Sequence, residues 1–122
     1  MILRNVIIAA DEVIIPMTAG RYSMQGIASL SDTINDAKEL NDDLKVAGIL
    51  LVDNEHTNLN NDTKEGIAQI AQQLGTKAFD SVVRHTVKVK EAQTHRMPLI
   101  KYARSCTAER DYEDFVEEYL GV

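Results

Sequence analysis

The chain carries the run Val-Ala-Gly-Ile-Leu-Leu-Val at residues 46–52, with no polar side chain inside it. A strand with one face in water alternates apolar and polar residues, so this uninterrupted run predicts a strand that is buried on both faces. Strands of that kind belong to parallel sheets that helices cover on both sides. The run therefore predicts an α/β fold, and it requires partner strands and covering helices elsewhere in the chain.

Two further segments predict the partner strands. One covers residues 13–16, where Pro16 closes it, and the other covers residues 79–83. Residues 2–10 favour a helix. Because the predicted strands alternate with helical stretches, right-handed crossovers would join them into a parallel sheet with helices on both faces. With 122 residues, of which 44% are hydrophobic, the chain has the size of a single domain over residues 1–122.

Three stretches carry apolar residues at steps of three and four, as helices with one face on a core do. The first begins near Ser23 and ends at residues 41–43, and the second opens at Asp62 and stops at Gly75. Thr107 caps the third. The side chains expected to face the core are Ile27, Leu30, Ile34, Ala37, Ile67, Ile70, Ala71, Leu74, Tyr112, Phe115, Val116 and Tyr119. The acids of the third helix expected to face water are Asp111, Glu113, Asp114, Glu117 and Glu118.

Composition argues against several classes of protein. No apolar run approaches the ~18–20 residues that cross a bilayer, and residues 1–12 lack the pattern of a signal peptide. The single cysteine, Cys106, has no second thiol for a disulfide, which suits a reducing compartment. We therefore expect a cytoplasmic protein that does not act on a membrane.

The net charge of −6 is distributed unevenly. Residues 84–104 contain six basic residues and one acid, a local charge of +5, whereas the remaining residues carry −11. The basic residues are Arg84, Lys88, Lys90, Arg96, Lys101 and Arg104. Ligands of parallel sheets bind beyond the carboxyl ends of the strands, where this polar segment is expected as a loop beside residues 16–22 and 53–61. It predicts contact with phosphate or a nucleic-acid backbone, and the alternative is an ordinary solvated loop.

Several kinds of site have no signature in the sequence. The six glycines form neither the Gly-x-x-x-x-Gly-Lys-Ser/Thr loop that cradles a triphosphate nor a Gly-x-Gly-x-x-Gly loop. His56, His85 and His95 are not at the spacing of helical metal ligands, so no metal site is expected. Residues 49–55 are similar to the first strand and acidic pair of a receiver domain, but the residues that follow are too few for its five βα units.

Five segments, taken in order, resemble the carboxyl-terminal part of the ParA/Soj-type partition ATPases, which are relatives of MinD. They are residues 9–16 (AADEVIIP), 22–26 (YSMQG), 48–51 (GILL), 57–59 (TNL) and 87–92 (VKVKEA). The resemblance covers nearly the whole chain and implies the carboxyl-terminal portion of a Rossmann-like sheet of the P-loop NTPase type. The family's Walker A loop, Walker B strand and switch have no counterpart in these residues. Whether the chain is an enzyme therefore stays open.

The resemblance also implies activities and site residues. The family uses ATP and Mg²⁺, forms ATP-sandwich dimers, binds DNA non-specifically and hydrolyses ATP when a ParB-type partner stimulates it. Arg84, His85 and Thr86 fall at the family's loop against adenine, whereas His56 and Lys88 fall at its two DNA-contacting arginines. The expected DNA-binding residues also include Lys90, Arg96, Lys101 and Arg104, because these side chains are positively charged.

Together these features predict the carboxyl-terminal portion of a DNA-segregation ATPase, associated with the nucleoid and forming homo-oligomers. Alone it would bind DNA weakly, hold no cofactor and catalyse no reaction. Two alternatives remain open at this point. One is a stand-alone module that oligomerises through an exposed sheet edge, and the other is an enzyme with an unrecognised site.

Overall fold

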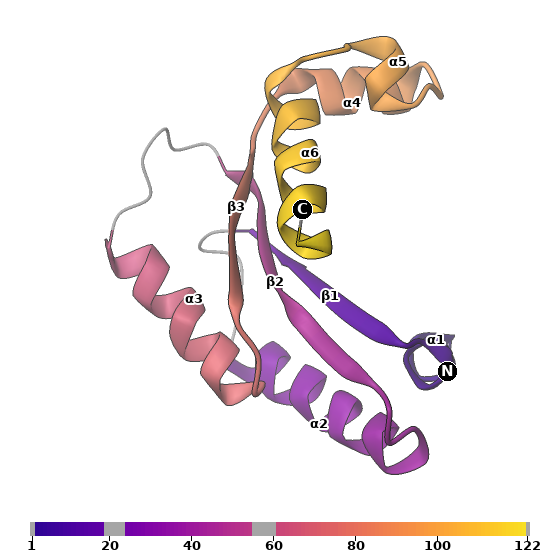
Figure 1. The fold of residues 1–122 in the computed structure, drawn as a ribbon, viewed down its shortest axis with the longest axis vertical. Helices are drawn as coiled ribbons and strands as arrows, with labels where there is room; N and C mark the ends of the chain where they lie inside the picture. Colours follow the sequence, from indigo (N-terminus) through magenta and orange to yellow (C-terminus); the bar gives the residue numbers. More distant parts are fainter. Residues whose placement is uncertain (1, 19–23, 55–60, 122) are drawn as a thin grey trace.

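In the computed structural model, which describes residues 2–18, 24–54 and 61–121, three strands form one parallel sheet. β1 spans Glu12–Met17, β2 spans Lys45–Asn54 and β3 spans Ala78–Arg84, and they lie side by side in that order (Figure 1). The predicted α/β class with a parallel sheet is confirmed. β1 runs one residue past Pro16, which the strand tolerates because β1 lies at an edge of the described sheet.

Helices lie on both faces of this sheet, as predicted. In the described part of the chain they are α1 (Ile2–Ala9), α2 (Met24–Leu40), α3 (Asn61–Gln73), α4 (Val87–Thr94), α5 (Leu99–Tyr102) and α6 (Thr107–Leu120). Figure 1 shows α2 and α3 on one side of the strands and α6 on the other. α1 packs on α2 through the buried side chains of Ile7 and Ala37, and Val13 of β1 packs against the same cluster.

Alternate residues of β2 reach the two cores, which explains why residues 46–52 contain no polar side chain. Ile49 and Leu51 face the first core, and Leu50 faces the second. The buried members of the first core are Ile15, Ile34, Ile49, Leu51, Ile67, Ile70, Ala71 and Leu74. Those of the second are Leu50, Phe79, Val83, Ala108 and Phe115. The predicted core stripes of the first two helices are therefore confirmed at these positions, and the Ile27 side chain lies outside the described residues.

Gly48 brings β2 close to the neighbouring strand. A Cβ atom at this position would lie 2.7 Å from the ring of Phe79 and 3.0 Å from the backbone oxygen of Lys77. The register of β1 against β2 also shifts here, between Val13 and Ile14. Position 48 therefore requires glycine, because a side chain there would collide with the Phe79 ring of β3 and with the backbone just before that strand.

The structure corrects two predictions about α6. Asp111 is buried, with 6% of its surface exposed, whereas Tyr112 and Val116 are 42% and 49% exposed. Ala108, Asp111 and Phe115 of the helix face β3. Asp111 can be buried there because its carboxylate pairs with the Arg84 guanidinium. Glu118 also turns inward, since its two carboxylate oxygens accept the backbone N–H groups of Asp80 and Ser81 at 2.8 Å each.

Other predicted boundaries differ by small amounts. Cys106, not Thr107, is the N-cap of α6, so the predicted side-chain cap is wrong. α3 begins at Asn61, one residue before Asp62, and the side chains of residues 61–64 lie outside the described ones. The left-handed stop at Gly75 is confirmed, with φ of 70°. The segment expected as a long loop instead contains α4 and α5.

Candidate functional site at the carboxyl edge of the sheet

The carboxyl ends of β2 and β3 lie together. Asn54 and Arg84 are register partners at the ends of the two strands, and the backbone N–H of His85 donates to the Asn54 carbonyl at 2.8 Å. Residues 53–54 and 84–104 thus lie at or beyond the carboxyl edge of the sheet, where the sequence predicted them. Residues 55–60 and 19–23 lie outside the described residues, and so does His56, the predicted DNA contact.

Arg84 ends β3 and is fixed by an acid of α6. Its Nε and Nη2 atoms donate to the two carboxylate oxygens of Asp111 at 2.9 Å each, and its backbone N–H donates to the same carboxylate at 2.9 Å. Burial alone would raise the pKa of Asp111, but the hydrogen bonds and charge of Arg84 outweigh it and lower that pKa. The same hydrogen bonds raise the pKa of Arg84. The Arg84 side chain remains 52% exposed, so this ion pair lies at the surface end of the second core.

His85 pairs with the end of the neighbouring strand. Its Nδ1 atom lies 2.6 Å from the Oδ1 atom of Asp53, which adopts a left-handed backbone conformation with φ of 52°. Aspartate tolerates this conformation better than most residues. The pair therefore ties residue 85, just after β3, to the carboxyl end of β2, and it directs the other ring nitrogen of His85 away from Asp53.

Thr86 starts the helix that the sequence analysis missed. It is the N-cap of α4, and its side chain accepts the backbone N–H of Lys88 at 3.3 Å. The three residues predicted to lie against adenine, Arg84, His85 and Thr86, are thus brought together at the sheet edge. Each of their side chains also has a partner within the chain.

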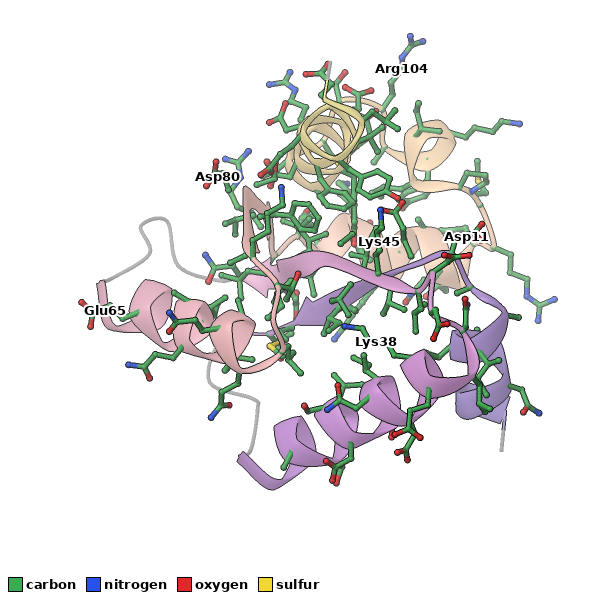
Figure 2. All side chains as sticks on the ribbon, turned by 60° about the horizontal axis from the view of Figure 1, so that its bottom comes forward. Asp11, Lys38, Lys45, Glu65, Asp80 and Arg104 are labelled. Carbon is green, nitrogen blue, oxygen red and sulfur yellow. The ribbon has the colours of Figure 1, made fainter. Side chains whose placement is uncertain are left out.

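The five other basic residues of the segment lie on α4, α5 and the turns that follow them. Lys88, Lys90, Arg96, Lys101 and Arg104 are all exposed. Lys88 makes a long contact of 3.8 Å with Glu91. Figure 2 shows the Arg104 side chain extending away from the body of the molecule, on the opposite side of the sheet from Lys38. We call Lys88, Lys90, Arg96, Lys101 and Arg104 the cationic segment.

Aromatic and polar contacts hold the cationic segment in place. Tyr102 of α5 donates its hydroxyl to Glu91 of α4 at 3.0 Å and stacks on the His95 ring, with centroids 5.1 Å apart. Arg96, two residues beyond the end of α4, adopts a left-handed backbone conformation with φ of 54°. Figure 1 places α4 and α5 beyond the carboxyl end of β3. The cations therefore lie on α4, α5 and the turns that follow them, beyond the carboxyl end of β3 (Figure 1).

Neither a metal-binding group nor a membrane-spanning helix is found among the residues that the structure describes. Within residues 2–18, 24–54 and 61–121, no group of three or more His, Cys, Asp or Glu side chains could hold a metal ion. The described helices include none long and apolar enough to span a membrane. Together with the absence of a glycine-rich loop from the sequence, these residues do not fit a triphosphate and Mg²⁺, and we derive no catalytic step through them.

Comparison with known proteins identifies relatives of this chain. A family model described as "AAA domain" matches residues 1–46. The chromosome-partitioning ATPase Soj of Treponema pallidum is 29% identical over 119 residues, which cover 96% of this chain and 46% of that protein. The sporulation initiation inhibitor protein Soj of Bacillus subtilis is 30% identical over 118 residues, 93% of this chain and 45% of that protein. An uncharacterized protein of Pseudomonas putida is 34% identical over 104 residues, 84% of this chain and 38% of that protein.

These matches agree with the resemblance found in the sequence and with the parallel sheet. The chain is related to the ParA/Soj-type partition ATPases. It spans between 38% and 46% of the length of the three relatives above.

Proposed function

We propose, from the relationship of this chain to the ParA/Soj-type partition ATPases, that it is the carboxyl-terminal portion of a ParA-like DNA-segregation ATPase. In this proposal it supplies a surface for non-specific DNA and the adenine side of a nucleotide site, without catalysing hydrolysis alone. The main support for this proposal is the cationic segment, whose five exposed side chains lie on α4, on α5 and on the turns that follow these helices.

Duplex DNA is a suitable partner for this arrangement. A chain with a net charge of −6 is repelled by DNA as a whole, so contact requires a local cluster of cations that reaches phosphates while the acidic body stays away. Lysine and arginine side chains bind backbone phosphates without reading base sequence. The cationic segment therefore favours weak, sequence-independent binding, which fits a nucleoid-associated protein of the cytoplasm.

The adenine side of a nucleotide site is proposed for Arg84, His85 and Thr86. The Arg84 guanidinium donates hydrogen bonds from Nε and Nη2 to the Asp111 carboxylate, and about half of the Arg84 side chain is exposed. A planar guanidinium held in this way offers a flat face on which a purine stacks. The phosphates and Mg²⁺ of bound ATP would be held by residues outside this chain, and a ParB-type protein and a second ATPase subunit are the partners the family relationship suggests.

Salt dependence of DNA binding tests this proposal. A labelled duplex of arbitrary sequence is titrated with the chain at several salt concentrations, and binding is followed by fluorescence anisotropy. If all five cations contact phosphates, the slope of log K against log salt approaches about −4.5. Binding that does not change with salt, or no binding at low salt, would contradict phosphate contact.

A second candidate function is a self-associating module, and the uncovered face of β1 favours it. β1 lies at an edge of the described sheet, and Ile14 in that strand is 37% exposed on the side that α6 occupies over β2 and β3. Unpaired strand edges and uncovered apolar residues promote pairing with another chain. Light scattering over a range of concentrations separates the two cases, since a monomer at high concentration counts against this candidate.

A further inference from the structure

The outer side of α6 carries an apolar groove that neither proposed function uses. The groove has a volume of about 610 Å³ and lies between α5 and α6. Seven residues line it: Leu99, Ile100, Glu109, Tyr112, Glu113, Val116 and Glu117. We call these residues the α5–α6 groove.

The exposed apolar side chains of the α5–α6 groove are gathered in one place and not scattered singly over the surface. Ile100, Tyr112 and Val116 expose 51%, 42% and 49% of their surfaces, and all three line the same hollow. Single exposed apolar residues are ordinary, but several that gather in one hollow indicate a surface for an apolar ligand. The opposite side of α6 packs on β3. The helix therefore carries apolar side chains on two sides, one in the core and one in the groove.

The charges of the α5–α6 groove indicate the character of its occupant. The lining contains three glutamates, Glu109, Glu113 and Glu117, spaced four residues apart along one side of α6. Glu109 is buried, whereas Glu113 and Glu117 are exposed. Like charges at this spacing repel one another on a helix. The neighbouring Glu109 carboxyl raises the pKa of Glu113. A cation seated against this row would relieve the repulsion.

We propose that the α5–α6 groove docks a basic amphipathic helix of a partner protein. Aliphatic side chains of that helix would lie against Ile100, Tyr112 and Val116. Its lysine or arginine side chains would meet the exposed carboxylates of Glu113 and Glu117. The row from Glu109 to Glu117 extends about 12 Å, the length of roughly two helical turns. This mode of recognition, an amphipathic helix in an apolar groove, is common among protein complexes.

Two synthetic peptides test the proposal. The first is a dye-labelled amphipathic helix of leucine and lysine, with leucines spaced three and four residues apart, and the second has glutamate in place of every lysine. We expect the basic peptide to bind the chain and the acidic peptide not to bind. Equal binding of both peptides, or no binding of the basic one, would overturn the proposal.

Matched variants separate docking in the groove from attraction to an acidic protein. The double variant Glu113→Lys/Glu117→Lys changes charge in the groove, and Asp36→Lys/Glu39→Lys makes the same charge change on the exposed side of α2. We expect the groove variant to weaken basic-peptide binding about tenfold or more and the α2 variant to change it by less than about threefold. Equal weakening by both variants would mean that net charge alone attracts the peptide.

A second pair of variants tests the apolar contact without changing charge. Val116→Ser removes an apolar side chain from the groove, whereas Leu120→Ser removes one that is 63% exposed on the same helix but is not part of the lining. Only Val116→Ser should weaken peptide binding. If sedimentation instead finds that the chain dimerises by itself and that Val116→Ser abolishes the dimer, the occupant is a second copy and the proposal is wrong.

Discussion

Arg84 and Asp111, 27 positions apart in the sequence, are joined by two side-chain hydrogen bonds of 2.9 Å that fix the end of β3 to α6. The backbone N–H of Arg84 donates to the same carboxylate, so Asp111 accepts three hydrogen bonds in a nearly buried position. This one acid therefore secures the strand end, the covering helix and the orientation of a proposed nucleotide contact.

Replacing Asp111 with asparagine should destabilise the fold and reduce its sensitivity to acid. Because Arg84 lowers the pKa of the folded Asp111, this pair stabilises the fold above the ordinary aspartate pKa of about 3.9, and the stabilisation is lost as the pH falls below it. We expect Asp111→Asn to cost about 1–3 kcal/mol near neutral pH and less at acid pH. Urea unfolding at several pH values measures both effects, and an equal cost at every pH would contradict this role.

Glu118 should protect the outer edge of the sheet. Its carboxylate accepts the backbone N–H groups of Asp80 and Ser81 in β3, which is an edge strand of the described sheet. Glu118→Ala leaves these N–H groups without that acceptor, so we expect a loss of about 1–3 kcal/mol and greater self-association. Glu117→Ala on the same helix is the matched control, because Glu117 is exposed and lines the groove. Unfolding and light scattering would be unchanged by Glu118→Ala if the contact were unimportant.

A side chain at Gly48 should disturb the second core. The nearest atom to an added Cβ is a ring carbon of Phe79 at 2.7 Å, and Lys77 O lies at 3.0 Å. The ring packs edge-to-face on Phe115, with centroids 4.9 Å apart, so it cannot move without loss of that contact. We expect Gly48→Ala to cost about 1–3 kcal/mol and to lower the thermal midpoint. Gly75→Ala is the control: its Cβ meets no atom within 4 Å, so its cost reflects only the left-handed backbone at 70°.

ATP turnover by the chain alone should be negligible. These 122 residues contain no glycine-rich phosphate loop, and the side chains that the structure describes include no metal-binding group. Release of inorganic phosphate from ATP and Mg²⁺ should therefore not exceed the rate measured with Arg84→Ala. Turnover that depends on Arg84 would contradict the proposal that the chain is not catalytic by itself.

The sequence predicted the sheet well because its signal is local. The apolar residues at 46–52 make β2 recognisable without its neighbours, and the steps of three and four in α2 and α3 reveal which side of each helix is buried. The orientation of α6 was predicted less well. Its Tyr112 and Val116 fit an apolar stripe, but the pairing of Asp111 with Arg84 selects a different side, and that contact is long-range.

The edge residues were predicted as a group, but their local structure was not. The charge count identified residues 84–104, and the structure displays their cations at the carboxyl end of β3. The helices α4 and α5 were missed because the segment has few apolar residues to show a helical period. The start of α4 could have been predicted from Thr86, which is a suitable N-cap residue. It is followed by residues of high helix propensity, namely Lys88, Lys90 and Glu91.

Paired lysine variants test most directly the proposal that the cationic segment binds DNA phosphates. Lys88→Ala/Lys90→Ala removes two cations from α4, and Lys38→Ala/Lys45→Ala removes the same charge from α2 and the start of β2. We predict that the first variant weakens duplex binding and reduces the magnitude of the salt slope by about 1.8, while the second leaves the slope nearly unchanged. Equal slopes for the two variants would contradict the proposal.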